Sequence, residues 1–460
     1  MPGIILRLVV IVCVACSSIA ASIARAQGAT LIRDSEIEHI IREWSDPLFL
    51  AAGLDPASIR IFLVNDRSLN AFVAGGQNLF LHTGLLQEST SAGQVIGVMA
   101  HETGHIAGGH LARSDEALRA AQDVSLFHTL LGLGIMVLGA AAGAGSGAAK
   151  VGGAIIAGGQ ITGIRTLLSY TRVQENSADQ AGLFYLDATQ ESARGLHEFL
   201  SVLVRQELLV TARQDPYLRT HPLTRDRLDV IAEHMRGSPW TDVAESARRT
   251  RQHARMRAKL FGFLERPGRV LREYPVTDKS VPARYARAVA YMRDSQLDAA
   301  LAEIDSLIGE SPDDPFFNEL KGQILFESGK VRAATPYYQA AVRLKPDDPL
   351  LLTGWAQTLV ETGDPDLGRA AIRPLERSVQ LDPANAMAWR LLSVAHGREG
   401  NIGRSSLAAG EQALLGGRLE DALLHADRAE HAFPHGSPGW LRAQDIRDLA
   451  NQQMKKHKRS

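Results

Sequence analysis

The apolar residues of this chain fall into a few blocks that differ in length and spacing. A short run, LVVIVCVAC, follows Arg7, and a second run, VIGVMAHETGHIAGG, has polar residues inside it. A third block, from Leu126 to Ile164, carries one formal charge, at Lys150. From about residue 281 onward, small, aromatic and proline residues recur at helical spacing. We therefore expect a mainly α protein whose second half is a helical repeat array.

The second half of the chain has the period of tetratricopeptide repeats. Pro312, Pro346 and Pro383 are separated by 34 and 37 residues, and Pro434 follows 51 residues later. The unit that matches best has small, aromatic and proline residues at the crossing, turn and stop positions, namely Gly322, Gly329, Ala334, Tyr338, Ala341 and Pro346. The next unit has three extra residues around DPD, and a helix near residues 407–414 is expected to serve two repeats.

These patterns predict about four repeats over residues 281–450, followed by a basic tail at 451–460 that we interpret as a solvated end. A long helix from about Trp240 to Leu264 and a linker at 266–280 precede them. Repeat arrays of this kind form concave surfaces for peptides or proteins and carry no chemistry of their own.

The N-terminus is typical of an exported protein. Ala24, Arg25 and Ala26 form an A-x-A cleavage signal after the apolar run, so we predict a signal peptide at 1–26 and a domain at 27–265. A transmembrane anchor is disfavoured because the run is short. Cys13 and Cys16 both lie before the cleavage site, which leaves no thiol in the mature chain, and lipidation at Cys16 is the competing interpretation.

Charge gives little information about partners. The chain has 50 basic and 51 acidic residues, a net charge of −1, and nothing in the sequence favours nucleic acid as a partner.

The second apolar run contains the pattern H-E-x-x-H at His101, Glu102 and His105. Residues four apart share one face of a helix, so both imidazoles can point at one Zn²⁺. Glu102 is then placed to take a proton from a water molecule activated by the metal. The pattern predicts a zinc peptidase with one Zn²⁺ per chain, and the competing interpretation is an ordinary amphipathic helix with two histidines.

The third ligand has to come from elsewhere in the chain. Another class of zinc peptidases has a histidine where this chain has Leu111, and His110 is one residue early. On a continuing helix, His110 would be rotated off the metal face, so we interpret it as structural or as a partner of a ligand. The segment SYTRVQENSADQAGLFYL supplies Glu175 as a ligand and, four residues later, Asp179, which could orient His101 or His105. Nearby small residues favour close helix packing over a solvated face.

The blocks HETGHIAGGH, YTRVQENSADQAG and THPLTRDRL together resemble the gluzincin peptidases related to CAAX prenyl proteases, and most closely the BepA-like periplasmic branch with C-terminal tetratricopeptide repeats. The resemblance implies zinc on His101, His105 and Glu175, catalysis by Glu102, and supporting roles for Asp179 and Arg227. It places His221 near the metal, as an oxyanion stabiliser or a resting-state ligand. A turn histidine before Pro222 is the alternative.

The stretch IRIFLVNDRSLNAFVAGGQNLFLHTGLL resembles the N-terminal strands of the same family. The resemblance implies a gluzincin-type first domain with a small sheet, and hence a mainly α (α+β) fold. The resemblance implies a strand edge at Asn70, Ala71 and Phe72 that binds an extended substrate by backbone pairing.

The apolar block 126–164 lies between the two predicted ligand helices, and we expect a hairpin broken at GAGSG. Four interpretations stay open: a cover over the active site, a shallow contact with a membrane or partner, a buried pair of small-residue helices, or a transmembrane hairpin.

Two functions compete at this point. The first is a periplasmic zinc endopeptidase that cleaves unfolded or misassembled envelope proteins, with repeats that bind an outer-membrane assembly machine. The second is a chaperone or scaffold for unfolded envelope proteins in which proteolysis is secondary. Glu102 favours the enzyme, because a binding module needs no general base beside its ligands.

Overall fold

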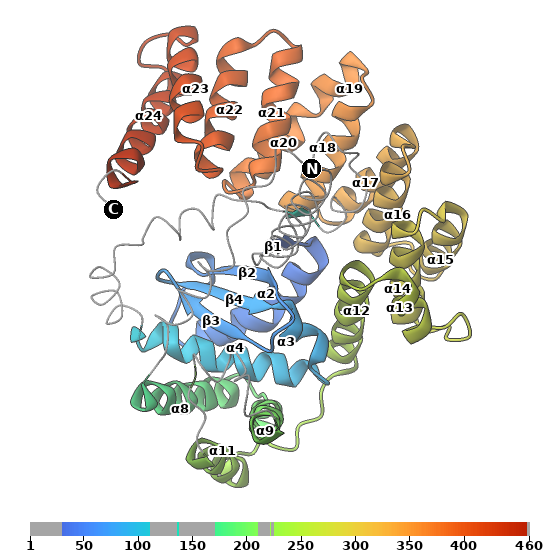
Figure 1. Ribbon diagram of the computed structural model, residues 1–460, viewed down its shortest axis with the longest axis vertical. Helices are drawn as coiled ribbons and strands as arrows, with labels where there is room; N and C mark the ends of the chain where they lie inside the picture. The colour runs from blue at the N-terminus through green and yellow to red at the C-terminus, as the bar shows by residue number, and fades with distance from the viewer. Residues whose placement is uncertain (1–29, 111–135, 138–170, 210–220, 222–224, 458–460) are drawn as a thin grey trace, which may run out of the picture.

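The computed structural model describes residues 30–110, 136–137, 171–209, 221 and 225–457. Among the described residues, the first half of the chain combines five strands with helices (Figure 1). Its elements are β1 (Thr30–Arg33), α2 (Ser35–Ala51), the 3₁₀ turn η1 (Pro56–Ser58), β2 (Arg60–Asn65), β3 (Ala71–Ala74), β4 (Asn78–His82), α3 (Thr83–Glu88), α4 (Ala92–Ala107), β5 (Met136–Val137), α8 (Arg172–Ala188), α9 (Arg194–Leu209), α11 (Arg225–Gly237) and α12 (Ala247–Leu264).

The strands form one small mixed sheet in the order β3-β4-β2-β1-β5. β3 and β4 are antiparallel neighbours, whereas β2 and β4 are parallel, with Leu63 opposite Leu81. Both residues are fully buried, and α4 lies against the β3 end of the sheet. This arrangement places the edge strand β3 beside the helix that carries the H-E-x-x-H pattern (Figure 1).

Helices α4 and α8 cross at very short range because small residues meet at the crossing. A Cβ atom added to Gly104 would lie 2.6 Å from the carbonyl oxygen of Ala178, and one added to Gly182 would lie 3.1 Å from the backbone of Ala100. The close packing expected from the small residues beside Glu175 is therefore confirmed. Thr171 and Gln174 form a capping box at the start of α8, which fixes where this helix begins.

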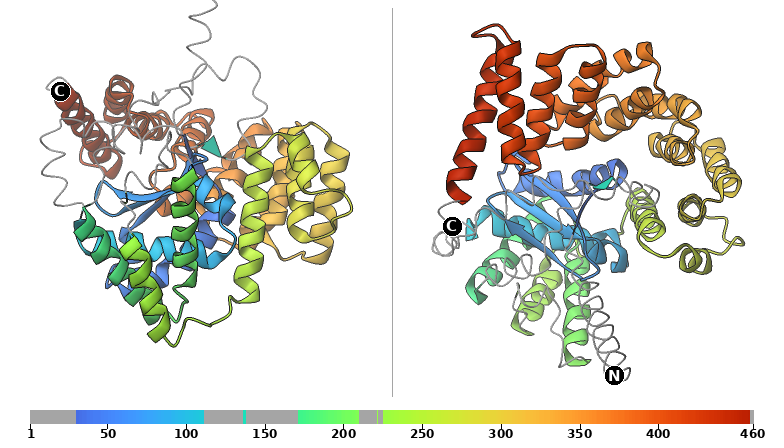
Figure 2. Two further views of the ribbon diagram at one scale, coloured as in Figure 1. Left: turned by 60° about the horizontal axis from the view of Figure 1, so that its bottom comes forward. Right: turned by 45° about the horizontal axis from the view of Figure 1, so that its top comes forward.

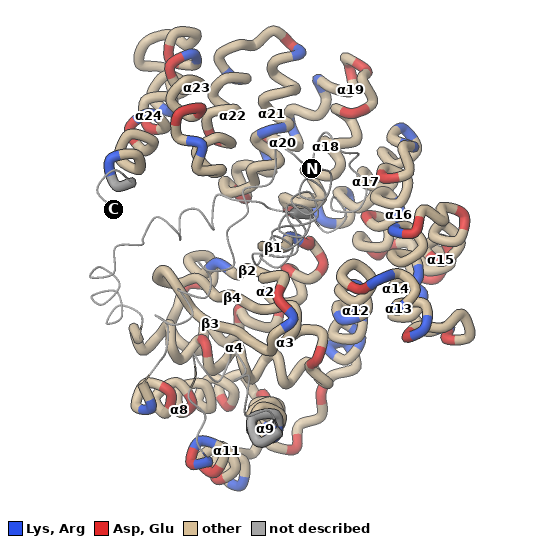
Figure 3. The backbone as a smooth tube through the Cα atoms, in the orientation of Figure 1, with Lys and Arg blue, Asp and Glu red and all other residues tan. Residues whose placement is uncertain are grey.

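The second half of the chain is a helical array that curves round the sheet (Figure 2). Its helices are α13 (Pro267–Glu273), α14 (Val281–Arg293), α15 (Leu297–Glu310), α16 (Pro315–Glu327), α17 (Val331–Leu344), α18 (Pro349–Glu361), α19 (Pro365–Ala370), α20 (Ile372–Leu381), α21 (Ala386–Arg398), α22 (Ile402–Leu415), α23 (Leu419–Ala432) and α24 (Pro438–His457). The mainly α class with a small sheet is confirmed. Basic and acidic residues are interspersed along the array (Figure 3).

The repeat signals correspond to defined local structures. The first three prolines of the repeat period each follow the end of a helix. The N-cap of the next helix comes two residues later, at Asp314, Asp348 and Asn385. The three extra residues coincide with a second helix that is divided into α19 and α20. Helix α22 packs on both α21 and α23, as expected for a helix that serves two repeats.

The main hydrophobic core does not stop at the start of the repeats. It includes Tyr285, Val289 and Phe317 together with Trp44 and Leu48 of the first half. Helix α13 occupies residues 267–273 of the predicted linker and packs on α14. The first repeats are therefore continuous with the first domain in packing, although the sequence period begins only at about residue 281.

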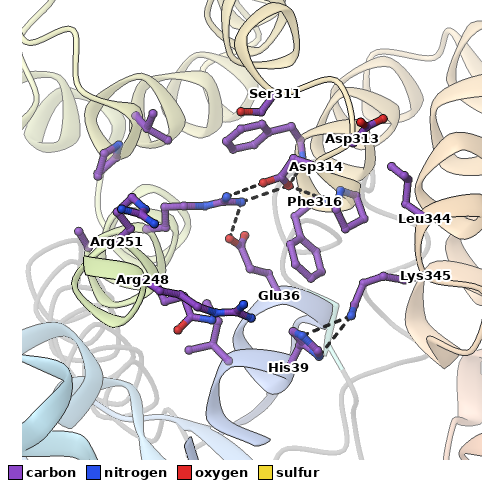
Figure 4. A pocket seen from close by; sticks show the side chains of 18 of the residues that line it. Glu36, His39, Arg248, Arg251, Ser311, Asp313, Asp314, Phe316, Leu344 and Lys345 are labelled. Atoms are coloured by element: carbon purple, nitrogen blue, oxygen red, sulfur yellow. Dashed lines mark hydrogen bonds and ion pairs between the residues drawn. The ribbon is translucent and has the colours of Figure 1, made fainter. Parts of the chain in front are cut away.

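Beside this core lies a group of buried and partly buried charged and polar residues that we call the interdomain charge cluster: Asp34, Glu36, Arg255, Lys259, Tyr285, Asp314 and Glu319. Glu36 accepts a hydrogen bond from the Tyr285 hydroxyl at 2.7 Å and lies 2.6 Å from an Arg255 nitrogen. Arg255 also contacts Asp314 at 2.5 Å. Glu36 and Asp314 lie on the wall of a cavity of about 730 Å³ between the two halves (Figure 4).

Several predicted segments lie outside the described residues. These are the signal peptide at 1–26, with Cys16, and the block 126–164 apart from Met136 and Val137, which pair with β1. The long helix expected from Trp240 begins at Ala247, where Ser246 caps it. Helix α24 continues to His457 within the predicted tail. Among the described helices, none has the length and apolar character needed to cross a membrane.

Candidate metal centre

Helix α4 carries the three residues of the H-E-x-x-H pattern, and all three are fully buried. Their positions in the helix follow from the sequence spacing. The Nε2 atoms of His101 and His105 lie 3.1 Å apart, because residues four apart stand one turn above the other on the same face. The two imidazoles therefore face a common point.

Two further residues reach the same point from other segments. Glu175, on the first turn of α8, has a carboxylate oxygen 3.3 Å from His105 Nε2 and the other 3.5 Å from His101 Nε2. The Nδ1 atom of His221 lies 3.0 Å from Glu175 Oε1. One ligand atom from each of His101, His105, Glu175 and His221 lies within 4.8 Å of all the others. We call these four residues the metal-site cluster.

Asp179 and Arg227 surround this cluster and hold its members in place. Asp179 Oδ1 lies 2.8 Å from His101 Nδ1, so it is His101, not His105, that Asp179 contacts. Arg227 donates to both oxygens of Asp179, at 2.6 and 2.9 Å, and lies 2.5 Å from Glu175 Oε2. One guanidinium thus bridges the carboxylates of Glu175 and Asp179, which stand four residues apart on α8.

We expected His110 on a continuing helix and rotated off the metal face. The expectation of a continuing helix was wrong. Helix α4 ends at Ala107, and Gly109 adopts a left-handed conformation with φ of +61°. The chain turns back, and His110 Nδ1 comes to lie 3.0 Å from Nδ1 of His105. The interpretation as a partner of a ligand agrees with this contact.

Sequence reasoning missed Gln174, whose side chain donates to the His110 carbonyl at 3.4 Å. The sequence signal at this position was the T-x-x-Q pattern of Thr171 and Gln174, which predicts the start of a helix but not the contact with His110.

The buried charges of the site shift one another's pKa values. Burial opposes ionisation of Glu175, but the charge of His221 and the hydrogen bonds from His105 and His221 outweigh it and hold the pKa of Glu175 well below its usual range. Burial lowers the pKa of His105 well below its ordinary value. The pKa of His221 is raised overall. Burial opposes its protonation, but the carboxylates of Glu175 and Glu102 favour the protonated imidazole and outweigh burial. The arrangement favours an ionised carboxylate beside a neutral His105.

Glu102 differs from the four residues of the cluster. Burial raises its pKa, and neither of its carboxylate oxygens has a hydrogen-bond partner among the described residues. Its Oε1 lies 3.4 Å from His221 Nε2. A buried carboxylate without hydrogen bonds is costly unless another group completes the site. Three imidazoles and one carboxylate converging beside it are the donor set that Zn²⁺ prefers, so these residues fit a metal ion.

Asn70, Ala71 and Phe72 lie at and before the start of the edge strand β3, and all three are buried. The Asn70 carbonyl accepts from the backbone of His82, and its side-chain oxygen and nitrogen have no hydrogen-bond partner among the described residues. Phe72 stacks on Phe80 with ring centroids 4.9 Å apart. The strand therefore has the predicted edge position, and substrate binding by these residues stays a prediction.

The chain is similar to known proteins over most of its length. Residues 32–235 match peptidase family M48, and residues 285–349 and 353–414 match tetratricopeptide repeats. The beta-barrel assembly-enhancing protease of Escherichia coli (strain K12) is 25% identical over 89% of this chain and 82% of its own length. That of Yersinia pestis is 25% identical over 86% and 79%. A Vibrio cholerae relative, provisionally given the same name, is 27% identical over 88% and 82%. Among solved structures, the tetratricopeptide-repeat protein YrrB is 18% identical, covering 43% of this chain and 91% of its own, with a TM-score of 0.28.

Proposed function

Since the chain carries a family M48 metallopeptidase domain followed by tetratricopeptide repeats, we propose that it is a periplasmic zinc endopeptidase that cleaves unfolded or misassembled outer-membrane proteins. The observation that supports this most directly is the metal-site cluster beside Glu102, which combines a ligand set with a carboxylate that lacks hydrogen bonds. The names of the relatives, which refer to β-barrel assembly, support the choice of substrate class.

In this proposal His101, His105 and Glu175 hold the zinc ion. When bound, zinc supplies Lewis acidity, which lowers the pKa of a water molecule to about 7 and polarises a peptide carbonyl. Glu102 takes the proton of the attacking water and returns it to the leaving amine. The raised pKa of Glu102, caused by burial, suits a group that must hold a proton and release it in turn.

Asp179 and Arg227 have positioning roles. Asp179 accepts a hydrogen bond from His101 Nδ1, which leaves the Nε2 lone pair of His101 for the metal. Arg227 fixes Asp179 through two hydrogen bonds and balances the charge of Glu175.

We propose that His221 is a resting-state ligand that must leave before substrate binds. Its Nδ1 lies 3.4 Å from His101 Nε2 and 3.0 Å from Glu175 Oε1, among the ligand atoms themselves. On this basis His221→Ala should retain zinc and raise the rate of hydrolysis. If His221 instead stabilises the oxyanion, the same change should lower kcat by about 10²-fold or more. Steady-state kinetics on the variant distinguishes the two roles.

Substrate binding is assigned to the edge of β3 and recruitment to the repeats. An extended segment would pair with the backbone at Asn70 to Phe72, and β3 is at the end of the described sheet, next to α4. The repeat array would bind the outer-membrane assembly machinery, because arrays of this kind present concave surfaces to peptides and proteins. A peripheral membrane contact through 126–164 belongs to the same proposal.

The test uses the full mature chain. Metal analysis should find one Zn²⁺ per chain in the wild type and loss of stoichiometric zinc in His101→Ala and Glu175→Ala. Glu102→Gln should keep the zinc and lose cleavage of casein, since it removes the proton acceptor and no ligand. Stoichiometric zinc in both ligand variants would refute the site, and full casein cleavage by Glu102→Gln would refute its role as general base. Wild-type protein that binds zinc but cleaves no casein would favour the chaperone function.

A further inference from the structure

The two histidines of the H-E-x-x-H pattern are supported in different ways. His101 Nδ1 is held by the Asp179 carboxylate, whereas His105 Nδ1 lies 3.0 Å from Nδ1 of another imidazole, that of His110. The rings of His105 and His110 meet edge to face, with centroids 5.1 Å apart. His110 is only 5% exposed, so this contact is not shared with bulk solvent.

The local sequence builds this contact. Gly109 takes a φ of +61°, which lets the chain reverse after α4 and brings His110 back toward the helix. The ring then lies against Gly108, where a Cβ atom would stand 2.5 Å from His110 Nε2. Gln174, the neighbour of Glu175, binds the His110 carbonyl. Two glycines and a side chain from α8 thus fix one imidazole against another.

We propose that His110 is a positioning residue that holds His105 in the tautomer and orientation in which its Nε2 lone pair faces the metal-site cluster. His105 Nδ1–H donates to His110 Nδ1, so Nε2 of His105 carries no proton and can bind a metal. This inference rests on the proposed zinc site. It adds a residue that the H-E-x-x-H pattern does not contain.

The choice of an imidazole at position 110 has an electrostatic reason. Glu102, Glu175 and Asp179 already place three buried carboxylates around the site, and Arg227 contacts two of them. A carboxylate at position 110 would add a fourth negative charge in a region of low dielectric. A neutral imidazole accepts the same hydrogen bond without that cost.

The test compares zinc affinity in four variants of the mature chain, measured by competition with a chelator of known affinity. His110→Leu removes the acceptor and should weaken zinc binding by about 10- to 100-fold. His110→Asn keeps a carbonyl acceptor and should restore most of the affinity. Gly108→Ala leaves His110 in place but displaces its ring, and it should also weaken binding. Gly309→Ala is the matched control, because a Cβ atom there meets nothing within 4 Å.

A second readout needs no activity. In the zinc-bound wild type, the ¹H and ¹⁵N shifts of His105 Nδ1–H should report a hydrogen bond to a neighbouring acceptor, and in His110→Leu this signature should be lost. Equal zinc affinity in wild type and His110→Leu overturns the inference, as does equal loss in the Leu and Asn variants. If His110→Leu does not fold, Gly108→Ala against Gly309→Ala decides. Wild-type protein that binds no zinc refutes the proposed function itself, a different result from normal zinc binding that is insensitive to position 110.

Discussion

Two buried clusters in this molecule use similar residue types and are built on different principles. In the metal-site cluster the ligand atoms converge within 4.8 Å, and the adjacent Glu102 oxygens have no hydrogen-bond partner among the described residues. In the interdomain charge cluster Glu36 contacts Tyr285, Arg255 and Lys259, the last at 3.4 Å. A buried carboxylate without hydrogen-bond partners indicates a site that another group must complete. A buried carboxylate that is fully paired indicates a structural contact between segments of the fold.

The largest expected effect comes from the same substitution in each cluster. Glu102 and Glu36 are both almost completely buried, at 0% and 1% exposure. Glu102→Gln should lower kcat by about 10²- to 10⁴-fold through loss of the general base, with the melting temperature unchanged or higher. Glu36→Gln should lower the melting temperature and leave kcat unchanged, because it weakens the pairs with Arg255 and Lys259. Casein hydrolysis and thermal unfolding of the two variants measure both effects.

The difference in role between the two clusters would be contradicted if Glu36→Gln lost activity while keeping its melting temperature. That result would mean that the interdomain charge cluster takes part in catalysis. A strong loss of stability in Glu102→Gln would mean that Glu102 has partners that the structure does not show.

The second prediction concerns removal of one buried cation. Lys259 Nζ lies 2.8 Å from Asp34, 3.4 Å from Glu36 and 3.8 Å from Glu319. Lys259→Met should cost about 3–5 kcal/mol of unfolding free energy, because it leaves buried carboxylates without their partner. Urea unfolding measures the loss. The double variant with Asp34→Asn should recover part of it, and no recovery would place the cost in packing instead of charge.

The third prediction is that only one of the clusters responds to zinc. At free zinc about 100 times the dissociation constant, binding stabilises the fold by about 2.7 kcal/mol. A chelator should remove this increment from the wild type and equally from Lys259→Met, because the interdomain cluster needs no ion. Glu175→Gln should show no increment. Urea unfolding with zinc and with chelator checks all three proteins, and a smaller increment in Lys259→Met would show that the two clusters are coupled.

The metal-site cluster was largely predictable from sequence because its geometry is set by local rules. His101 and His105 share a helix face, and Glu175 and Asp179 share another by the same spacing. The block THPLTRDRL supplied His221 by resemblance, with no periodicity to support it. The small sheet was likewise expected from the resemblance, whereas the repeat period was readable from the spacing of residues.

The remaining features depend on contacts between distant segments. We placed His110 on a continuing helix, but α4 ends at Ala107. Two glycines can end a helix or lie within one, and the sequence alone does not show which of the two occurs. The interdomain charge cluster joins Asp34 to Glu319 across most of the chain, and no local signal marks such a pair. The boundary near residue 281 marks a change of period and not a gap in the core.

The smallest expected effect is a pH dependence that arises from one residue of the interdomain charge cluster, Glu319. Burial, together with the carboxylates of Asp34, Asp348 and Glu36, raises the pKa of Glu319 to about 8 against the attraction of Lys259. The fold therefore prefers protonated Glu319. This contribution to stability is fully present below about pH 4.5, the pKa expected in the unfolded chain, and is lost as the pH rises through about 8.

Glu319→Gln keeps a neutral side chain at every pH and should abolish this loss. Between pH 6 and 8 the free energy of unfolding of the wild type should fall by roughly 1 kcal/mol per pH unit more than that of the variant. Urea unfolding at several pH values measures the difference, with the exposed Glu361→Gln in the same array as control. Parallel curves for wild type and Glu319→Gln would mean that Lys259 keeps Glu319 ionised, in which case the interdomain charge cluster is an ordinary ion-pair network with no proton of its own.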